Sequence, residues 1–254
     1  MDNVAVVTGA ASGLGAALCR LLAARGVAVV AADIDAAGLV GLAADTAIHT
    51  QVVDVSDDDQ VGRLVHGTVA ELGRIDFLFN NASIRLGGTA EHMPLPQWQR
   101  LVDVNLWGVV HGTRHAYPLM RAQGAGHIVN VTSLAGLTPV APSAAYAMTE
   151  HAVVGLSTAL RVEAAASGVA VSVAVAGGVA TDIVDSAIDL PRYSYREPVR
   201  RIPIGMINAE RAARHILRGM RKNKPYIVFP RYNRAVIAAH RWCPSLMSRL
   251  GGRE

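Results

Sequence analysis

Residues 4–15 read VAVVTGAASGLG, and this stretch decides the fold. Its first five residues are apolar or β-branched, as in a buried strand. Gly9, Gly13 and Gly15 follow in the spacing G-x-x-x-G-x-G, and an apolar helical pattern begins directly after them. Glycine at these positions permits a tight turn and a close approach of the backbone to a bound group. The stretch therefore predicts a strand, a glycine-rich turn and a helix in that order.

Short β-branched runs alternate with longer helical stretches along most of the chain. We interpret these runs as continuously apolar, not alternating, which is typical of parallel strands covered on both faces. Strand–helix alternation predicts right-handed βαβ units. We therefore predict an α/β protein: a single-domain, doubly wound Rossmann fold with a seven-stranded parallel sheet and helices on both faces. The expected strands are Val4–Thr8, Val27–Asp33, His49–Val55, Ile75–Asn80, His127–Thr132, Val169–Val175 and Pro225–Phe229, and the longest expected helices are Gly13–Arg25, Asp57–Leu72, Pro96–Arg121 and Ser143–Ser167.

Composition excludes several classes of protein. Apolar runs such as Val27–Ala32 are far shorter than the roughly 20 residues of a membrane span. No basic segment with a cleavage site precedes Val4, so no secretory signal is expected. Cys19 and Cys243 show neither metal-ligand spacing nor a disulfide framework. These features predict a cytoplasmic protein without a metal site.

The glycine turn indicates a dinucleotide site. A helix that begins at this turn presents N–H groups and a positive dipole to an anion such as a pyrophosphate, and Ser12 and Leu14 lie within the same loop. The alternative is a glycine-rich turn that binds nothing. Asp33 ends the second strand, where a carboxylate bonds the ribose hydroxyls of NAD and repels the 2′-phosphate of NADP. Neither Ser12 nor Ile34 offers that phosphate a cation, so we predict NAD; the alternative role for Asp33 is a helix N-cap.

Two hydroxyl groups fit the chemistry of alcohol and ketone interconversion. Hydride transfer leaves one proton to be moved at the substrate oxygen, and the phenol of Tyr146 is the candidate general acid/base. Ser133, thirteen residues earlier at the end of a strand, can stabilise alkoxide charge on the same oxygen. Taken singly, Ser133 reads as a turn hydroxyl and Tyr146 as a packing residue. Their register with the glycine turn favours catalysis.

Several motifs in order make the chain resemble the short-chain dehydrogenase/reductase family, to about residue 230. They are the glycine turn, Asp54-Val55, Asn80-Asn81-Ala82, Asn105, Ser133 and Tyr146. The resemblance implies that Asp54 and Val55 flank the adenine and that Asn81, Ala82 and Val179 line the cofactor cleft. It further implies that Thr181 reaches the nicotinamide amide and that the side chain of Asn105 holds a relay water. Helices Pro96–Arg121 and Ser143–Ser167 match those that pair in family homodimers and homotetramers.

Three residues depart from the family pattern. Ser83 replaces the glycine that closes Asn-Asn-Ala-Gly, Ala176 replaces a proline, and Glu150 replaces the lysine four residues after the tyrosine. The first two are tolerable. The family lysine bonds the nicotinamide ribose and lowers the pKa of the tyrosine, so Glu150 takes a position in both the catalytic and the cofactor site.

The charge of Glu150 bears directly on Tyr146, because residues i and i+4 share a helix face. At an effective dielectric of about 20, unit charges about 5 Å apart interact by roughly 3 kcal/mol, or about 2 pKa units. Exchange of a cation for an anion then raises the tyrosine pKa by about 4 at most. We expect slow alcohol oxidation at neutral pH, faster oxidation at alkaline pH, and a higher kcat in Glu150→Lys.

Two alternatives soften this expectation. Glu150 can be protonated and still bond the ribose hydroxyls, or another cation can take the place of the lysine. No lysine lies between Met1 and Arg221, and His151 is expected to point elsewhere on the helix. The second alternative therefore has no lysine available to it.

The remaining segments concern substrate and partners. Residues 1–230 are expected to form the dinucleotide-binding and catalytic domain, with residues 181–208, rich in proline and tyrosine, covering a mainly apolar substrate. Four arginines between positions 192 and 201 form either a solvated face or a site for an acidic group. Residues 231–254 form a basic amphipathic tail that packs on its own domain, on another subunit, or weakly on an anionic membrane surface; nucleic-acid binding is not expected.

The sequence thus predicts an NAD-dependent oxidoreductase that interconverts a secondary alcohol and a ketone on a small hydrophobic substrate. Asn105, Ser133 and Tyr146 would carry the chemistry, modified by Glu150. The alternative is a catalytically impaired NAD-binding protein of the same fold that acts through binding or assembly.

Overall fold

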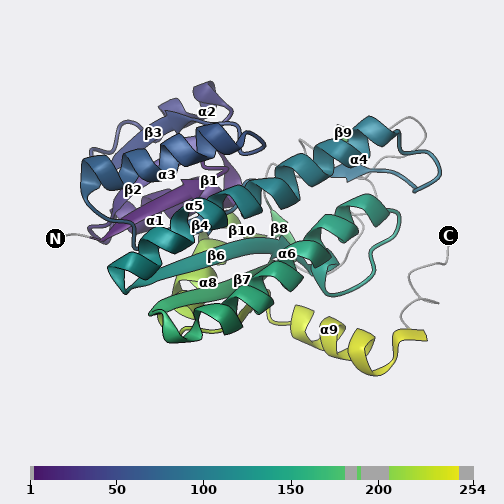
Figure 1. Cartoon of the computed structure of the whole chain (residues 1–254). Coiled ribbons are helices and arrows are strands. Elements are labelled where there is room, and N and C mark those ends of the chain that lie inside the picture. Colours follow the sequence, from purple (N-terminus) through teal and green to yellow (C-terminus); the bar gives the residue numbers. More distant parts are fainter. Residues whose placement is uncertain (1–2, 181–187, 190–205, 246–254) are drawn as a thin grey trace.

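The computed structural model describes residues 3–180, 188–189 and 206–245 of the chain (Figure 1). A seven-stranded sheet forms its centre, in the order β11-β7-β6-β4-β1-β2-β3, and every neighbouring pair is parallel. The order reverses between β1 and β4, as in a doubly wound sheet. The predicted fold and all seven predicted strands are confirmed. Their bounds are β1 Val4–Thr8, β2 Ala28–Asp33, β3 Ile48–Val52, β4 Phe77–Asn80, β6 Gly126–Ser133, β7 Val169–Ala176 and β11 Tyr226–Phe229.

Helices cover both faces of the sheet (Figure 1). Because side chains alternate along a strand, Ala5 and Val7 of β1 pack into one core with α1 and α8, whereas Val6 packs into the other with α3 and α5. Small β1 residues let both layers approach the sheet closely. The bounds are α1 Gly13–Ala23, α2 Ala36–Val40, α3 Asp58–Leu72, α4 Leu95–Leu101, α5 Gly108–Gln123, α6 Ala144–Glu163, α8 Ala209–Arg221 and α9 Asn233–Trp242.

Strand β3 differs from its prediction as a strand covered on both faces. Only Ile48 is buried, and the other four residues of the strand are exposed. The strand lies at the edge of the sheet, next to the short helix α2, so one side has no neighbouring strand. Its polar residues, such as His49 and Gln51, suit that edge position.

The stretch predicted as one helix over Pro96–Arg121 has a different internal geometry. Helix α4 passes into a π-helix, η1 (Val102–Trp107), and then into α5. Such π-segments widen the helix and often occur at functional sites. Here the widened segment contains Asn105, a predicted site residue.

Two short strand pairs frame the predicted substrate-covering segment. Strand β8 (Val179–Ala180) pairs with β10 (Ile207–Asn208), and β5 (Leu86–Gly87) pairs with β9 (Ile188–Asp189). Residues 181–187 and 190–205 of the segment, Thr181 among them, lie outside the described residues. The contact of Thr181 with the nicotinamide amide therefore stays a prediction.

The tail forms helix α9, which ends two residues before Pro244 and lies at the edge of the molecule (Figure 1). Val236 and Ile237 are half-buried, whereas the Trp242 side chain is 82% exposed. The helix thus packs only one face on its own domain. Among the described residues, no helix is both long and apolar enough to cross a bilayer.

Candidate active site

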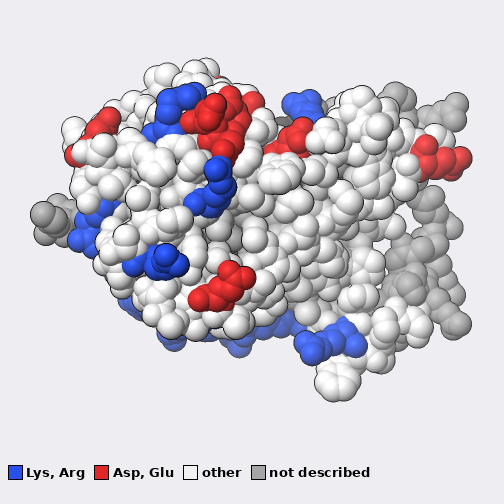
Figure 2. Space-filling model, viewed as in Figure 1, with Lys and Arg blue, Asp and Glu red and all other residues white. Residues whose placement is uncertain are grey.

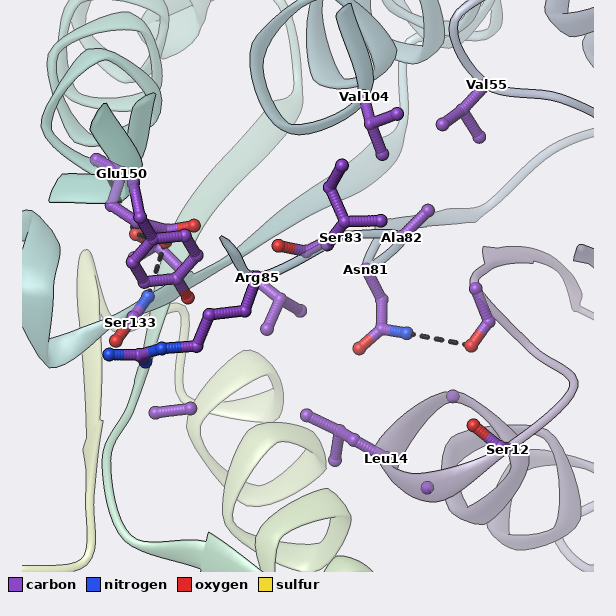
Figure 3. Close-up of a pocket in the computed structure, with 18 of the residues that line it drawn as sticks. Ser12, Leu14, Val55, Asn81, Ala82, Ser83, Arg85, Val104, Ser133 and Glu150 are labelled. Carbon is purple, nitrogen blue, oxygen red and sulfur yellow. Dashed lines mark hydrogen bonds between the residues drawn. The ribbon is translucent and has the colours of Figure 1, made fainter. Parts of the chain in front are cut away.

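A cavity of about 870 Å³ opens at the carboxyl edge of the sheet. It spans the point between β1 and β4 where the strand order reverses, the usual ligand crevice of a doubly wound sheet. Figure 3 shows Ser12 and Leu14 at one end of this cavity and Ser133 and Glu150 at the other. Of the predicted site residues, the cavity is lined by Gly9, Ser12, Gly13, Leu14, Gly15, Asp33, Asp54, Val55, Asn81, Ala82, Ser133, Tyr146, Glu150 and Val179.

The glycine turn has the geometry that a pyrophosphate requires. Gly9 and Gly13 have φ angles of 66° and 49°, which a side chain disfavours. A Cβ on Gly9 would lie 2.7 Å from the Cα atom of Ala82, and one on Gly15 would lie 1.9 Å from the carbonyl oxygen of Gly9. The Ser12 side chain forms no capping bond to α1. The N–H groups of the first helical turn therefore face the cavity as anion donors.

Asp33 lies at the carboxyl end of β2 and is not the N-cap of the next helix. Its Oδ2 accepts from the N–H of Ala11 at 2.9 Å, and its Oδ1 accepts from the N–H of Asp35 at 3.0 Å. Asp35 caps α2 by accepting from the N–H of Gly38 at 3.1 Å. Each Asp33 oxygen keeps a further lone pair, so the carboxylate can also accept from ribose hydroxyls. The N-cap alternative is thereby replaced by a role at the cavity.

Asp54, Val55 and Ser83 form another part of the cavity wall. Asp54 Oδ1 accepts from both the N–H and the hydroxyl of Ser56, at 2.9 and 2.7 Å. Val55 and Val104 lie beside each other at the rim (Figure 3). The Oγ of Ser83 is buried and has no hydrogen-bond partner within the described part of the chain. A buried hydroxyl without a partner in a cavity wall indicates that a ligand completes its bonding.

The catalytic end of the cavity contains Ser133 and Tyr146. Ser133 ends β6, and its Oγ accepts from the N–H of Ala135 at 3.2 Å, which leaves the hydroxyl hydrogen for a substrate oxygen. Tyr146 lies in the first turn of α6 and is 4% exposed. Both residues line the cavity that contains the glycine turn. A phenol and a hydroxyl at one end of a nucleotide-sized crevice can bond a single carbonyl oxygen.

Glu150 is buried against the end of β6. Its Oε2 accepts from the Thr132 hydroxyl at 2.5 Å and from the N–H of Ser133 at 2.6 Å. Burial raises the pKa of the Glu150 carboxyl; hydrogen bonds from Thr132, the Ser133 backbone and Tyr146, and the charge of Arg85, oppose this rise. A lysine in the same rotamer would meet the Ser133 N–H donor to donor. The kcat gain expected for Glu150→Lys thus requires another rotamer.

Arg85 is a cavity residue that the sequence did not reveal. Its Cζ atom lies 4.6 Å from the centroid of the Tyr146 ring, and its charge acts on Glu150. Figure 3 shows its side chain reaching toward Ser133 and Glu150. The sequence left open that a cation other than lysine stands near the tyrosine, and Arg85 is a candidate for it. The signal available in the sequence was its position in the loop after β4, four residues after the predicted site residue Asn81.

Asn105 lies just outside the cavity wall and is 3% exposed. Its Oδ1 accepts from the N–H of Ile84 at 2.8 Å, and its Nδ2 donates to the carbonyl of Ile84 at 2.9 Å and to the Thr149 hydroxyl at 3.4 Å. These bonds tie the loop after β4 to η1 and α6. The geometry supports a positioning role, and the contact with a relay water stays a prediction.

The loop after β7 is held by the last described helix. Asn233 is 1% exposed, and its Nδ2 donates to the carbonyls of Gly177 and Phe229 at 3.3 and 2.8 Å. Gly177 and Val179 line the cavity beyond Ser133. The C-terminal helix therefore fixes a turn of the cavity wall, a role that the sequence did not indicate.

Known proteins are similar to this chain in sequence and in fold. The sequence model of a family described as short chain dehydrogenase matches residues 3–189 of this chain. Cis-4-hydroxycyclohexanecarboxylate dehydrogenase from Sinomonas cyclohexanicum is 38% identical over 211 residues, which cover 81% of this chain and 84% of that protein. A short-chain dehydrogenase/reductase from Burkholderia phymatum, solved in complex with NAD, has a TM-score of 0.88 and 29% identity, with coverage of 96% and 95%. A 3-ketoacyl-(acyl-carrier-protein) reductase from Brucella melitensis, complexed with NADH, has a TM-score of 0.80 and 27% identity, with coverage of 88% and 94%.

The fold and the cavity define an oxidoreductase of the doubly wound class. The chain belongs to the short-chain dehydrogenase/reductase family. The resemblance inferred from its motifs is confirmed.

Glu150 makes stability depend on pH in a direction that can be measured. A carboxyl with a raised folded pKa binds its proton more tightly in the folded chain, so stability falls as pH rises from its ordinary pKa of 4.5 through the raised value. Glu150→Gln keeps an oxygen that accepts from Thr132 and Ser133 but does not titrate. We expect its free energy of unfolding, relative to that of the natural chain, to increase as the pH rises above the ordinary carboxyl pKa of 4.5. Urea denaturation at fixed protein concentration measures this difference.

Glu163→Gln is the matched control, because Glu163 is exposed on the same helix. Its difference from the natural chain is expected to stay flat over the same pH range. Equal pH dependence in the two variants would show that the Glu150 carboxyl has an ordinary pKa in the folded chain.

Proposed function

We propose that this protein is an NAD-dependent oxidoreductase that interconverts a secondary alcohol and a ketone. One observation supports it most: Ser133 and Tyr146 line the same cavity as the glycine turn and Asp33. That placement fits a dinucleotide with its adenine between Asp54 and Val55 and its reactive ring beside the tyrosine. The orphaned Ser83 hydroxyl and the glycine cradle support the same occupant.

The residues at the catalytic end divide the work on one oxygen atom. In oxidation, the substrate C–H bond breaks with its electron pair and the O–H proton passes to the phenolate oxygen of Tyr146. In reduction, Tyr146 returns a proton to the oxygen while the Ser133 hydroxyl bonds it. The nicotinamide accepts or supplies the hydride when bound. Val179 and the glycine pair before it would exclude water from one side of the ring.

The activity is tested by NADH absorbance against a panel of apolar cyclic and open-chain ketones and alcohols. We expect turnover, with alcohol oxidation increasing from about pH 7 to about pH 10 because the phenol must lose its proton. Tyr146→Phe is expected to lower kcat by a factor of about 10² to 10⁴. Tyr117→Phe, on α5 and outside the cavity wall, is the matched control and should leave kcat unchanged.

A second function remains because of Glu150: a family member that binds NAD without appreciable turnover. Its supporting observation is the buried Glu150 carboxyl, at the position where the family resemblance implies a lysine. Saturable NADH binding with no absorbance change on any substrate between about pH 7 and pH 10 would favour it over the enzyme.

The cofactor preference rests on Asp33. Its carboxylate repels a 2′-phosphate, and the neighbouring Ile34, 66% exposed at the cavity rim, offers that phosphate no charge. The two solved relatives with NAD and NADH support the same choice.

We expect NADH to bind more tightly than NADPH. Asp33→Asn keeps an oxygen for the N–H of Ala11 but removes the charge, and Ile34→Arg adds a guanidinium for the phosphate. The double variant should lower the Kd of NADPH by about tenfold or more, which corresponds to about 1.4 kcal/mol. Fluorescence titration measures both constants. Ile34→Gln, without the charge and with Asp33 intact, is the control and should leave NADPH weak; tighter NADPH than NADH binding in the natural chain would contradict the assignment.

The substrate is proposed to be a small, mainly apolar alcohol or ketone. Ile84 and Met206 are apolar residues of the cavity lining. The similar protein that acts on a hydroxycyclohexanecarboxylate supports a ring of that size. Arg100, also in the wall, can accommodate an acidic group at the far end of such a substrate.

A homodimer or homotetramer is proposed through the face formed by α5 and α6. Figure 2 shows a broad area without charged groups over the middle of the molecule, beside charged residues that α5 and α6 also carry, such as Arg114 and Glu163. Apolar side chains are exposed along these helices in the single chain: Met148 and Val162 of α6 are 44% and 77% exposed, and Trp107, the last residue of η1 before α5, is 48% exposed. Exposed apolar groups gathered on one face indicate an interface.

Gly155 of α6 provides a clean test of this interface. A Cβ there meets no atom within 4 Å of the single chain, so Gly155→Glu fits the isolated fold. We expect the variant to sediment as a smaller species than the natural chain, because a charge is desolvated at the interface. Gly67→Glu on α3, which is equally open, is the control and should leave the assembly intact. An unchanged mass for Gly155→Glu would place the interface elsewhere.

A further inference from the structure

A general base made from tyrosine needs a positive charge near its oxygen. At neutral pH an isolated phenol keeps its proton, because its ordinary pKa is about 10. Glu150 supplies no positive charge one turn after Tyr146. The two lysines of the chain, Lys222 and Lys224, are exposed in the turn that follows α8. A cation for Tyr146 must therefore come from a different residue type.

Arg85 has the required position. Its Cζ atom is 4.6 Å from the centroid of the Tyr146 ring, and the side chain reaches toward the catalytic end of the cavity (Figure 3). A guanidinium over an aromatic face is attracted by the ring and holds its charge at all accessible pH values. In a partly buried site a unit charge at about 5 Å lowers the pKa of an acid by about 2.

The backbone on both sides of Arg85 is fixed. Ile84 forms two hydrogen bonds with the side chain of Asn105, and Leu86 begins strand β5, which pairs with β9. Asn105 also bonds Thr149, whose hydroxyl donates to the carbonyl of Tyr146 at 2.8 Å. The loop that carries the arginine and the helix that carries the tyrosine are thereby joined. This rigidity keeps the guanidinium at the ring.

The carboxyl of Glu150 accepts a hydrogen bond from Tyr146 and is also tied to the end of β6. Its Oε2 takes the hydroxyl of Thr132 and the N–H of Ser133, which fixes the end of β6 beside α6. An anchoring acid and a separate cation thus divide two tasks that one lysine would otherwise combine. The charge of Arg85 also opposes the rise that burial causes in the pKa of Glu150.

We propose that Arg85 is a positioning residue for the reaction: its guanidinium supplies the positive charge that favours the phenolate form of Tyr146, in a site where Glu150 supplies none. The proposal rests on Tyr146 acting as the general acid/base. Arg85 itself does not take or give a proton. Its effect is on the protonation of the phenol.

The experiment measures the titration of Tyr146 in the free protein. Chain labelled with ¹³C at the tyrosine ζ carbon is titrated by NMR, and the Tyr146 signal is identified by its loss in Tyr146→Phe. We expect Arg85→Gln to raise the measured pKa of Tyr146 by about 1 to 2, and Arg85→Lys to recover at least half of that change. If the protein is active, the pH at which kcat for alcohol oxidation rises should increase by the same amount in Arg85→Gln.

Arg100→Gln is the matched control, because it removes an equal charge from the same cavity wall, on helix α4. Its Tyr146 titration should stay within about 0.3 of the natural chain, as expected for a more distant, solvated charge. If Arg85→Gln does not fold, Arg85→Met provides a neutral side chain of similar length for the same comparison.

Two results would overturn the proposal. One is an unchanged Tyr146 titration in folded Arg85→Gln. The other is a raised KM confined to substrates with a carboxylate, with the Tyr146 titration unchanged, which would make Arg85 a substrate ligand. The titration needs neither cofactor nor substrate, so it stays informative if no turnover is found; full activity in Tyr146→Phe would instead defeat the proposed function.

Discussion

The hydrogen bonds between Thr8 and the loop that follows β4 are the interaction on which the cavity depends. The Thr8 hydroxyl accepts from the N–H groups of Asn81 and Ala82, at 3.0 and 3.1 Å, and donates to the carbonyl of Phe79 at 3.3 Å. The Asn81 side chain donates in turn to the carbonyls of Thr8 and Gly9, at 3.0 and 3.1 Å. These bonds hold the ends of two adjacent strands so closely that only glycine fits at position 9. One wall of the crevice is fixed before any ligand arrives.

The other wall is fixed by a buried acid. Desolvation of the Glu150 carboxyl is unfavourable, and it is offset by donors from Thr132, Ser133 and Tyr146. Hydrogen bonds to charged or strongly polar groups contribute about 1.5–3 kcal/mol each, so the acid is held firmly where it lies. Its oxygen sets the direction of the Ser133 peptide and hence of the hydroxyl beside the substrate. At the position where the family resemblance implies a lysine, the neighbouring groups of Thr132 and Ser133 are thus donors that suit an acceptor such as Glu150.

The fold could be predicted because its signals are local. Apolar runs bounded by turns identify parallel strands, and the glycine turn identifies where the order of the sheet begins. Side-chain exposure at the edge could not be predicted, because β3 is identified as an edge only when all seven strands are arranged. The π-helix was also missed, since one residue added to a turn hardly changes the apolar periodicity around Asn105.

The site was predicted wherever a residue type and its position along a strand carry the meaning. Asp33, Ser133 and Tyr146 are of this kind, and the cavity contains all three. The environment of a side chain is a different matter. The i, i+4 relation places Glu150 and Tyr146 on one helix face but gives no view of the Thr132 hydroxyl or of Arg85. Those contacts arise from segments brought together only in the folded chain.

The clasp between Asn233 and Gly177 has a practical side. These residues are 56 positions apart along the chain, yet the side-chain amide of Asn233 donates to the backbone carbonyl of Gly177. A purification tag fused after α9, or a deletion that shortens α9, is therefore expected to disturb the cavity rim at Gly177. The opposite terminus leads into the first strand on the far side of the molecule, and it is the safer point of attachment (Figure 1).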